Sequence, residues 1–119
     1  MLRTVIELPR FDTGQYEGCE FHMVGGDATL VLRVSELPSI TLKFCRVRWH
    51  RYTQLYSCEA SWVKEAYFRL IEVSSTEGLA TFIKADSSSV KPYNELHHFR
   101  IFLDETGCHE VFAESVSAL

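Results

Sequence analysis

The chain has 119 residues, of which 46% are hydrophobic and 24% charged. These values are ordinary for a globular domain and exclude a largely disordered chain. No apolar run approaches the ~20 residues of a membrane-spanning helix, which speaks against a membrane protein. The length favours a single domain over residues 1–119.

Charge is spread unevenly along the chain, whose net charge is −4. Residues 1–58 carry seven Lys/Arg and six Asp/Glu, whereas residues 59–119 carry five and ten. A general nucleic-acid binder is usually basic, so this balance makes a nucleic-acid partner unlikely. An acidic C-terminal half suits a basic protein partner, although plain solubility explains it as well.

Cysteine usage indicates the compartment. Cys19, Cys45, Cys58 and Cys108 form no C-x-x-C pair, so zinc-ribbon and thioredoxin-like spacings are absent from the sequence. The N-terminal residues lack the apolar stretch of a secretory signal. We expect a cytoplasmic protein with four free thiols, the alternative being two disulfides in an exported protein.

The N-terminal third is predicted to form strands. Leu2–Leu8 is rich in β-forming residues, and Cys19–Val24 and Ala28–Val34 flank a Gly-Gly-Asp turn that is typical of a hairpin. Apolar residues alternate through Ala28–Val34, which places one apolar row on one face.

The run from Ser39 to Tyr56 is long, and its apolar phase changes near the middle. Ile40, Leu42 and Phe44 share one phase, and the opposite phase is shared by Cys45, Val47 and Trp49. A regular strand cannot keep one face buried across such a change. We expect a β-bulge or sharp bend near residues 44–45, or a strand whose halves serve opposite faces of a sandwich.

Two further elements follow before residue 86. Tyr67–Val73 favours a strand, with a helix over Glu59–Val73 as the competing interpretation. Thr76–Ala85 predicts a short helix, because Ser74 and Glu77 have the spacing of a capping box.

The C-terminal segment predicts a hairpin of His98–Asp104 and Cys108–Ser115 around the loop residues 105–107. A three-residue loop ending in glycine pairs Leu103 with His109 and Ile101 with Val111. The other face then carries His98 opposite Glu114, and Arg100 opposite Phe112, with Glu110 and Glu114 on the diagonals of Arg100.

Together these segments predict a mainly β fold. We expect a curved antiparallel sheet or small sandwich of about seven strands, with one short helix near residues 76–85. The expected core residues are Ile6, Leu30, Leu32, Leu42, Val47, Ile71, Phe99, Ile101 and Val111.

The first candidate site is the polar face of the last hairpin, formed by His98, Arg100, Glu110 and Glu114. A histidine beside carboxylates suits acid–base chemistry or ligand binding. The simpler interpretation is a set of exposed cross-strand ion pairs. Nothing near these residues resembles a nucleophile.

A second candidate site combines basic and aromatic residues. Arg46 and Arg48 share one face of the expected strand with His50, and Trp49 shares the other with Val47. Such faces bind single-stranded nucleic acid by stacking. The overall acidity of the chain favours the simpler interpretations, a solvated basic face or an internal partner for the acidic C-terminal half.

The sequence gives little support for a metal site or for a catalytic cysteine. The candidate metal ligands are His97, His98, Cys108 and His109, with His50 or Cys58 as further members. Strand alternation points His97 away from His98, and Cys108 away from His109, so convergence on zinc is not expected. Cys58 near His50 lacks the motif of a catalytic pair and suits a small buried hydrophobe. No phosphate-binding loop occurs, and we expect no cofactor.

The last 70 residues carry a resemblance. Val47-Arg48, Arg51-Tyr52, Ala66-Tyr67 and Leu70–Val73, then His97–Phe99, Gly107-Cys108 and Ala113–Ser115, resemble a family of small bacterial proteins with no assigned function. That family carries a Trp-His pair where this chain has Ser61-Trp62, so the chain would be a divergent member. The resemblance implies a shared fold over about residues 47–115 and no particular activity.

These observations favour a non-enzymatic cytosolic interaction protein, in one version an inhibitor or immunity-type partner of a basic protein. The alternative is a small-ligand-binding protein or enzyme with a pocket in the curved sheet, to which His98, Arg100 and Glu110 would contribute. Exposed edge strands in so β-rich a chain also suggest a homodimer.

Overall fold

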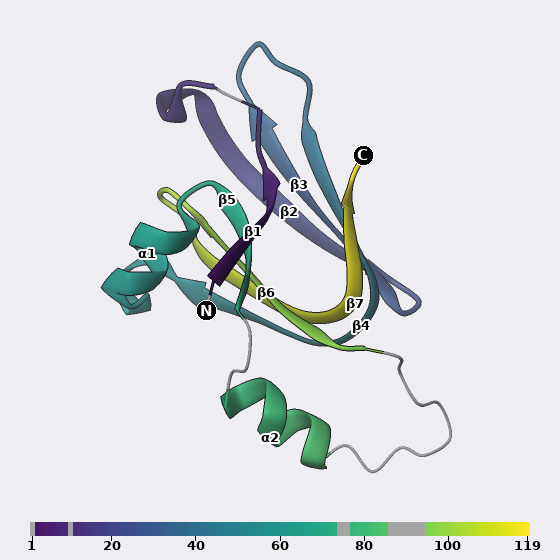
Figure 1. Cartoon of the computed structure of the whole chain (residues 1–119). Helices are drawn as coiled ribbons and strands as arrows, with labels where there is room; N and C mark the ends of the chain where they lie inside the picture. The colour runs from purple at the N-terminus through teal and green to yellow at the C-terminus, as the bar shows by residue number, and fades with distance from the viewer. Residues whose placement is uncertain (1, 10, 74–76, 86–94) are drawn as a thin grey trace.

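The computed structural model describes residues 2–9, 11–73, 77–85 and 95–119. In these residues seven antiparallel strands form one sheet, in the order β1-β5-β6-β7-β4-β3-β2 (Figure 1). The strands are β1 (Leu2–Glu7), β2 (Tyr16–Val24), β3 (Asp27–Val34), β4 (Ile40–Gln54), β5 (Arg69–Val73), β6 (His97–Leu103) and β7 (Gly107–Ala118). The helices are α1 (Ala60–Ala66) and α2 (Glu77–Ala85), with short 3-10 turns η1 (Thr13–Gln15) and η2 (Leu55–Ser57).

The prediction of a mainly β fold is confirmed. Of the two predicted architectures, the structure has the single curved sheet and not the sandwich. Figure 1 shows the central strands β4 and β7 bending strongly, so that the sheet wraps around one of its own faces. We call this the inner face. Its core consists of Ala28, Leu30, Leu32, Leu42, Phe44, Leu70, Phe99, Ile101, Leu103, Val111 and Ala113.

The opposite, outer face carries a smaller apolar cluster. Ala66 of α1 packs there with Ile71, Phe102 and Cys108. The ring of Phe82, from α2, lies edge-on to Phe112 of β7. Both helices therefore contact the outer face, and part of it is shielded from water.

Most of the expected core is buried as predicted. Two of its members, Ile6 and Val47, are only partly buried and pack against the inner core. A third, Ile71, belongs to the outer cluster. Phe44 and Phe102 are fully buried although the prediction omitted them.

The bend in β4 lies later than expected, at Arg46 to Trp49. Arg46 adopts a positive φ of 53°, and the register against β7 shifts between Val47 and Trp49. Val47 packs on the inner core, whereas Trp49 stacks on Phe112 of the outer face. The expected common row of Cys45, Val47 and Trp49 is therefore wrong, because two successive irregularities each reverse the alternation.

The last hairpin differs from its predicted register by two residues. Leu103 pairs with Gly107 and Ile101 with His109, so the turn consists of residues 104–106. A shift of two keeps every side chain on its predicted face, because strand alternation has a period of two. It does change the partners: Arg100 lies directly opposite Glu110, and the predicted pairing of Arg100 with Phe112 is wrong.

The helical content exceeds the prediction by one helix. A helix and a strand were the competing predictions for the segment 59–73. The structure has both in succession, first α1 and then β5. Helix α2 begins at Glu77, close to the predicted start, and the expected capping residue Ser74 lies outside the described residues. Within the described part of the chain, neither helix is long and apolar enough to cross a membrane.

Candidate functional site

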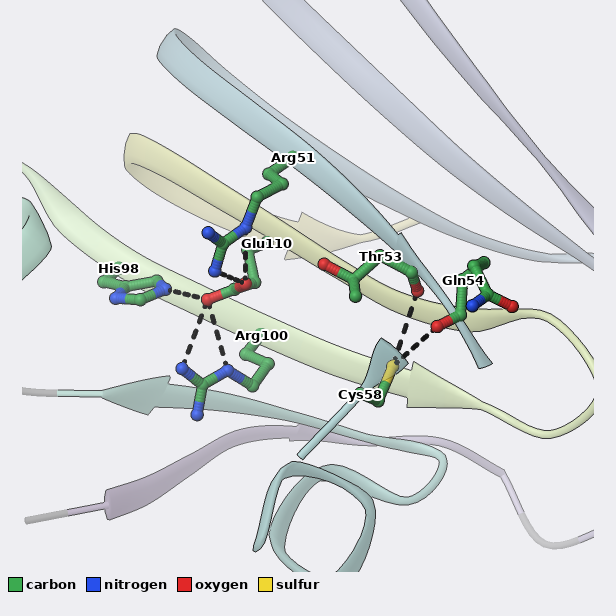
Figure 2. Close-up of polar contacts among 7 residues, drawn as sticks. All are labelled: Arg51, Thr53, Gln54, Cys58, His98, Arg100 and Glu110. Atoms are coloured by element: carbon green, nitrogen blue, oxygen red, sulfur yellow. Dashed lines mark hydrogen bonds and ion pairs between the residues drawn. The ribbon is translucent and has the colours of Figure 1, made fainter. Parts of the chain in front are cut away.

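Glu110 occupies the centre of the sheet and is the hub of the candidate site (Figure 2). It lies on β7, directly opposite Arg100 of β6 on one side and Arg51 of β4 on the other. His98 projects from β6 two residues before Arg100, onto the same face. Strand pairing alone therefore gathers three basic side chains around one carboxylate.

Both carboxylate oxygens of Glu110 accept hydrogen bonds. Oε1 accepts from Nε and Nη2 of Arg51, at 3.1 and 2.5 Å. Oε2 accepts from Nε2 of His98 at 2.7 Å, and from Nε and Nη2 of Arg100 at 3.3 and 3.2 Å. The imidazole of His98 therefore carries a proton on Nε2 when it donates to Glu110.

Aromatic rings cover this ion cluster. Trp62 of α1 lies over the guanidinium groups of Arg100 and Arg51, at 4.7 and 5.6 Å from its ring centroid. Trp49 approaches Arg51 from a second side, at 5.5 Å. Guanidinium groups stack favourably on indole rings, so the cover adds to the hydrogen bonds that hold the arginines in place.

Burial and neighbouring charges have opposite effects on the pKa of Glu110, a residue that is only 1% exposed. Desolvation by itself would raise the pKa of its carboxyl group, but hydrogen bonds from His98 and Arg51 and the charge of Arg100 outweigh it. The net effect lowers this pKa to about 2. Glu110 is consequently ionised at neutral pH.

The expectation that this face is exposed to solvent is wrong. His98, Arg100 and Glu110 are all buried. Arg51 is the partly exposed member, with 49% of its side chain accessible. A polar face was expected to be solvated, but Trp62 of α1 lies over the two guanidinium groups, and the rings of Trp49 and Phe112 lie edge-on to His98.

Glu114, the fourth predicted member, does not join this cluster. Its Oε2 lies 3.9 Å from Nε of Arg46, and this oxygen is buried without a hydrogen-bond partner among the described residues. The structure thus brings together three of the four predicted residues and adds Arg51 and Trp62, which the prediction did not include. Both additions are distant in sequence, since Arg51 is separated from Glu110 by 59 positions.

The chemistry open to the cluster is limited. A general base needs a pKa near the working pH and a free lone pair directed at its substrate. Glu110 has a lowered pKa, and three basic side chains occupy its oxygens. The arrangement is suited to joining β4, β6, β7 and α1 rather than to proton transfer.

The basic and aromatic candidates Arg46, Arg48 and Trp49 are not arranged as predicted. Trp49 stacks on Phe112 with a centroid separation of 4.2 Å, so its face is occupied by protein. Arg46 turns toward Glu114, and His50 lies beside Phe21 on the inner face. The predicted shared face of Arg46, Arg48 and His50 is wrong, because the irregularities in β4 reverse the alternation between them.

The candidate metal ligands are also dispersed. His97 contacts Glu72, Cys108 is buried in the outer cluster, and Cys58 directs its thiol toward the carbonyl oxygens of Thr53 and Gln54 (Figure 2). Among the described residues, no three His, Cys, Asp or Glu side chains are grouped so as to hold a metal ion.

The structure also reveals a contact that sequence reasoning missed. Cys19 Sγ of β2 lies 3.6 Å from Nε2 of His109 on the inner face. Burial raises the pKa of the Cys19 thiol, and desolvation, together with His50, lowers that of His109 to about 4. Both groups are neutral at pH 7, so this pair lacks the thiolate that nucleophilic catalysis requires. The two residues lie on strands separated by β4 and β3, so the contact depends on the curvature of the sheet.

Comparison with known proteins adds no assignment: no protein-family model, curated protein or solved structure matches this chain. The resemblance of residues 47–115 to a family of small bacterial proteins therefore stays a prediction.

Proposed function

We propose that the chain is a non-enzymatic, cytosolic interaction protein that binds a basic protein, as an inhibitor or immunity-type partner would. The observation that carries this proposal is that the side chains with acid–base chemistry are hydrogen-bonded within the protein. His98 and Arg100 both donate to Glu110, and Trp62 lies over Arg100, which supports a structural role for the residues best suited to catalysis.

The distribution of charge supports a basic partner. Arg51 and Arg100 pair with Glu110, and Arg46 pairs with Glu114, so arginines of the central strands neutralise acids within the sheet. Towards the periphery of the sheet, Arg3 pairs with Glu72, Arg33 with Glu20 and Lys43 with Asp27. The chain as a whole carries more acids than bases, with a net charge of −4, and an excess of negative charge accelerates association with a basic protein.

A cytosolic location is part of this proposal. The thiols of Cys19, Cys45, Cys58 and Cys108 are all free, which is usual in a reducing compartment.

Affinity capture tests the proposal. The purified chain is immobilised and exposed to lysate of its native cell at about 50 mM salt, and bound proteins are eluted by raising the salt to about 0.5 M. We expect one basic protein to be retained and then released by salt, and the purified pair to form a complex of defined stoichiometry. Absence of a specific partner at every salt concentration contradicts the proposal.

A second candidate function, binding of a small apolar molecule, is favoured by one cavity. It has a volume of about 380 Å³ and is lined by apolar residues that include Phe11, Val34, Leu37, Ile40 and Leu119. This volume lies within the range of small-molecule sites. Its residues differ from the predicted ligand-binding set of His98, Arg100 and Glu110.

Fluorescence titration with 1-aminoanthracene, an uncharged aromatic probe, tests this alternative. We expect saturable binding that Val34→Phe weakens by filling the cavity, whereas Val24→Phe, on the exposed end of β2, leaves it unchanged. Non-saturable binding, or equal binding by both variants, contradicts a ligand site there.

A further inference from the structure

The turn between β6 and β7 is held by hydroxyl groups from three tyrosines. Tyr16 Oη of β2 lies 2.8 Å from Thr106 Oγ1, and Tyr52 Oη of β4 donates to the Thr106 carbonyl oxygen at 2.5 Å. Tyr67 Oη, from the segment between α1 and β5, donates to Asp104 Oδ2 at 3.2 Å. Three separate parts of the chain therefore fix one three-residue turn, residues 104–106.

The backbone of this turn is also fixed from within. Glu105 adopts a positive φ of 61°, a conformation that side-chain-bearing residues rarely take. Its N–H donates to Asp104 Oδ1 at 3.0 Å, and the Thr106 N–H donates to the Leu103 carbonyl oxygen at 3.1 Å. A strained conformation persists only where the surroundings enforce it, and such residues concentrate at functional sites.

Three tyrosines with exposed rings lie on segments that contact or flank the turn: Tyr52 is beside His109 on the inner face, Tyr67 stacks on Phe102 on the outer face, and Tyr56 is in η2. Tyr52 is 51% exposed and Tyr67 is 37% exposed, although the hydroxyl groups of both are anchored. Tyr56 is 91% exposed, and η2 is the short turn that begins right after β4. The last residue of β4, Gln54, pairs with Gly107 at the base of the β6–β7 turn. Tyrosine is enriched in protein interfaces because it offers a large contact area at little entropic cost.

The negative charge of the turn favours a basic ligand. Glu105 is exposed at the tip, and the partly exposed Asp104 adds negative charge beside it, although its two oxygens accept from the Glu105 N–H and from Tyr67. Carboxylates form bidentate pairs with arginine, and guanidinium groups stack on tyrosine rings. A basic segment of a partner protein would meet both kinds of group together.

We propose that residues 104–106, with the rings of Tyr52, Tyr56 and Tyr67, form the docking surface for an arginine-bearing segment of the partner. This inference rests on the proposed function and deepens it. Because the turn is held in one conformation before binding, little entropy is lost when the partner docks. Tyr16 acts as a positioning residue beneath this surface, since its hydroxyl contacts Thr106.

The test uses a fluorescent peptide of eight Arg-Gly repeats, with the equivalent citrulline peptide as an uncharged control. Binding to the whole chain is measured by anisotropy at about 50 mM salt, and the contact surface is mapped by amide chemical shifts. We expect Glu105→Gln and Tyr56→Ser each to weaken binding of the arginine peptide by about fivefold or more. The exposed glutamate of α2 supplies the matched control, Glu77→Gln, which should bind within about twofold of the parent chain.

The outcomes separate the two proposals. Chemical-shift changes centred on residues 104–106, with weakened binding by both variants, support this surface. If the arginine peptide binds but Glu105→Gln and Tyr56→Ser bind as the parent does, the surface is wrong and the basic-partner function stands. If the arginine peptide binds no better than the citrulline peptide, the docking surface is wrong, and the basic-partner function also fails only if affinity capture recovers no basic protein.

Discussion

Glu110 is the residue on which most of the buried charge depends. Replacing it with alanine leaves Arg100 and His98 buried without their shared acceptor. Removing one partner of a buried ion pair typically costs about 3–5 kcal/mol, so we expect Glu110→Ala to lower the free energy of unfolding by about that amount. Urea denaturation measures it.

Glu114→Gln is the matched control on the same strand. Within the described part of the chain Glu114 has one ion-pair contact, 3.9 Å from Arg46, an arginine whose side chain is largely exposed. We expect a change under about 1 kcal/mol. Equal losses in Glu110→Ala and Glu114→Gln would contradict the central position assigned to Glu110.

His109 makes the protein sensitive to mild acid. Its pKa is lowered from 6.5 to about 4 in the folded chain, first by desolvation and then by His50. The unfolded chain therefore takes up this proton first as the pH falls. Stability from this source is full above pH 6.5, falls between about pH 6.5 and 4 by on the order of 3 kcal/mol, and then levels off.

Urea denaturation at several pH values checks this expectation in His109→Phe, which retains an aromatic ring beside Phe21. We expect the variant to lose much of the pH dependence between 6.5 and 4. The exposed His22 provides the control, since His22→Gln should retain it. A parent-like slope in His109→Phe would contradict the assignment.

Glu110 acts in a lower pH range. Its folded pKa of about 2 lies below the ordinary 4.5, so its contribution is present above pH 4.5 and is lost as the pH falls toward 2. Acid unfolding of the parent chain should therefore continue below the range of His109, and Glu110→Ala should lack this second phase.

At the scale of elements, the β6–β7 hairpin depends on Gly107. Gly107 has φ +133°, and a Cβ there would overlap the Thr53 carbonyl oxygen of β4. Gly25, in the β2–β3 turn, also has positive φ but has open space around it. We expect Gly107→Ala to destabilise the fold by about 3 kcal/mol or more and Gly25→Ala by about 1 kcal/mol.

Thermal unfolding of both glycine variants measures the difference. Gly25 has a φ of +62°, which side-chain-bearing residues can adopt, whereas Gly107 has a φ of +133° and a close contact with β4, so the difference reports both effects together. Equal shifts in melting temperature would show that the contact with Thr53 is relieved at little cost.

The predictability of an element follows the range of the forces that define it. The hairpin of β2 and β3 was predicted well, because its turn and its alternation are local. The register of β6 against β7 was wrong by two residues, since that shift preserves the apolar face and hence the pattern from which it was inferred. For the segment of α1, the sequence was compatible with a helix and with a strand. The helix is stabilised by packing of its apolar stripe on Phe102 and Ile71, a contact between distant segments.

At the scale of the whole molecule, the open sheet has two edges, β1 and β2. An unpaired strand edge invites pairing with another chain, and we expect a homodimer on that ground. Light scattering over a range of concentrations tests it. A mass of 13.7 kDa at every concentration would contradict it, whereas a mass twice as large would support it.

The sequence by itself determined the fold class, most strands and the inward-facing core, because alternation of apolar residues is a local property of an extended chain. It also placed His98, Arg100 and Glu110 on one face. Only the tertiary structure decided that this face is buried, that Arg51 completes the cluster and that Trp62 covers it. Those outcomes depend on β4 lying beside β7 and on α1 packing against β5 and β6, from where Trp62 reaches the two arginines. Contacts between distant segments leave no periodic trace in the sequence.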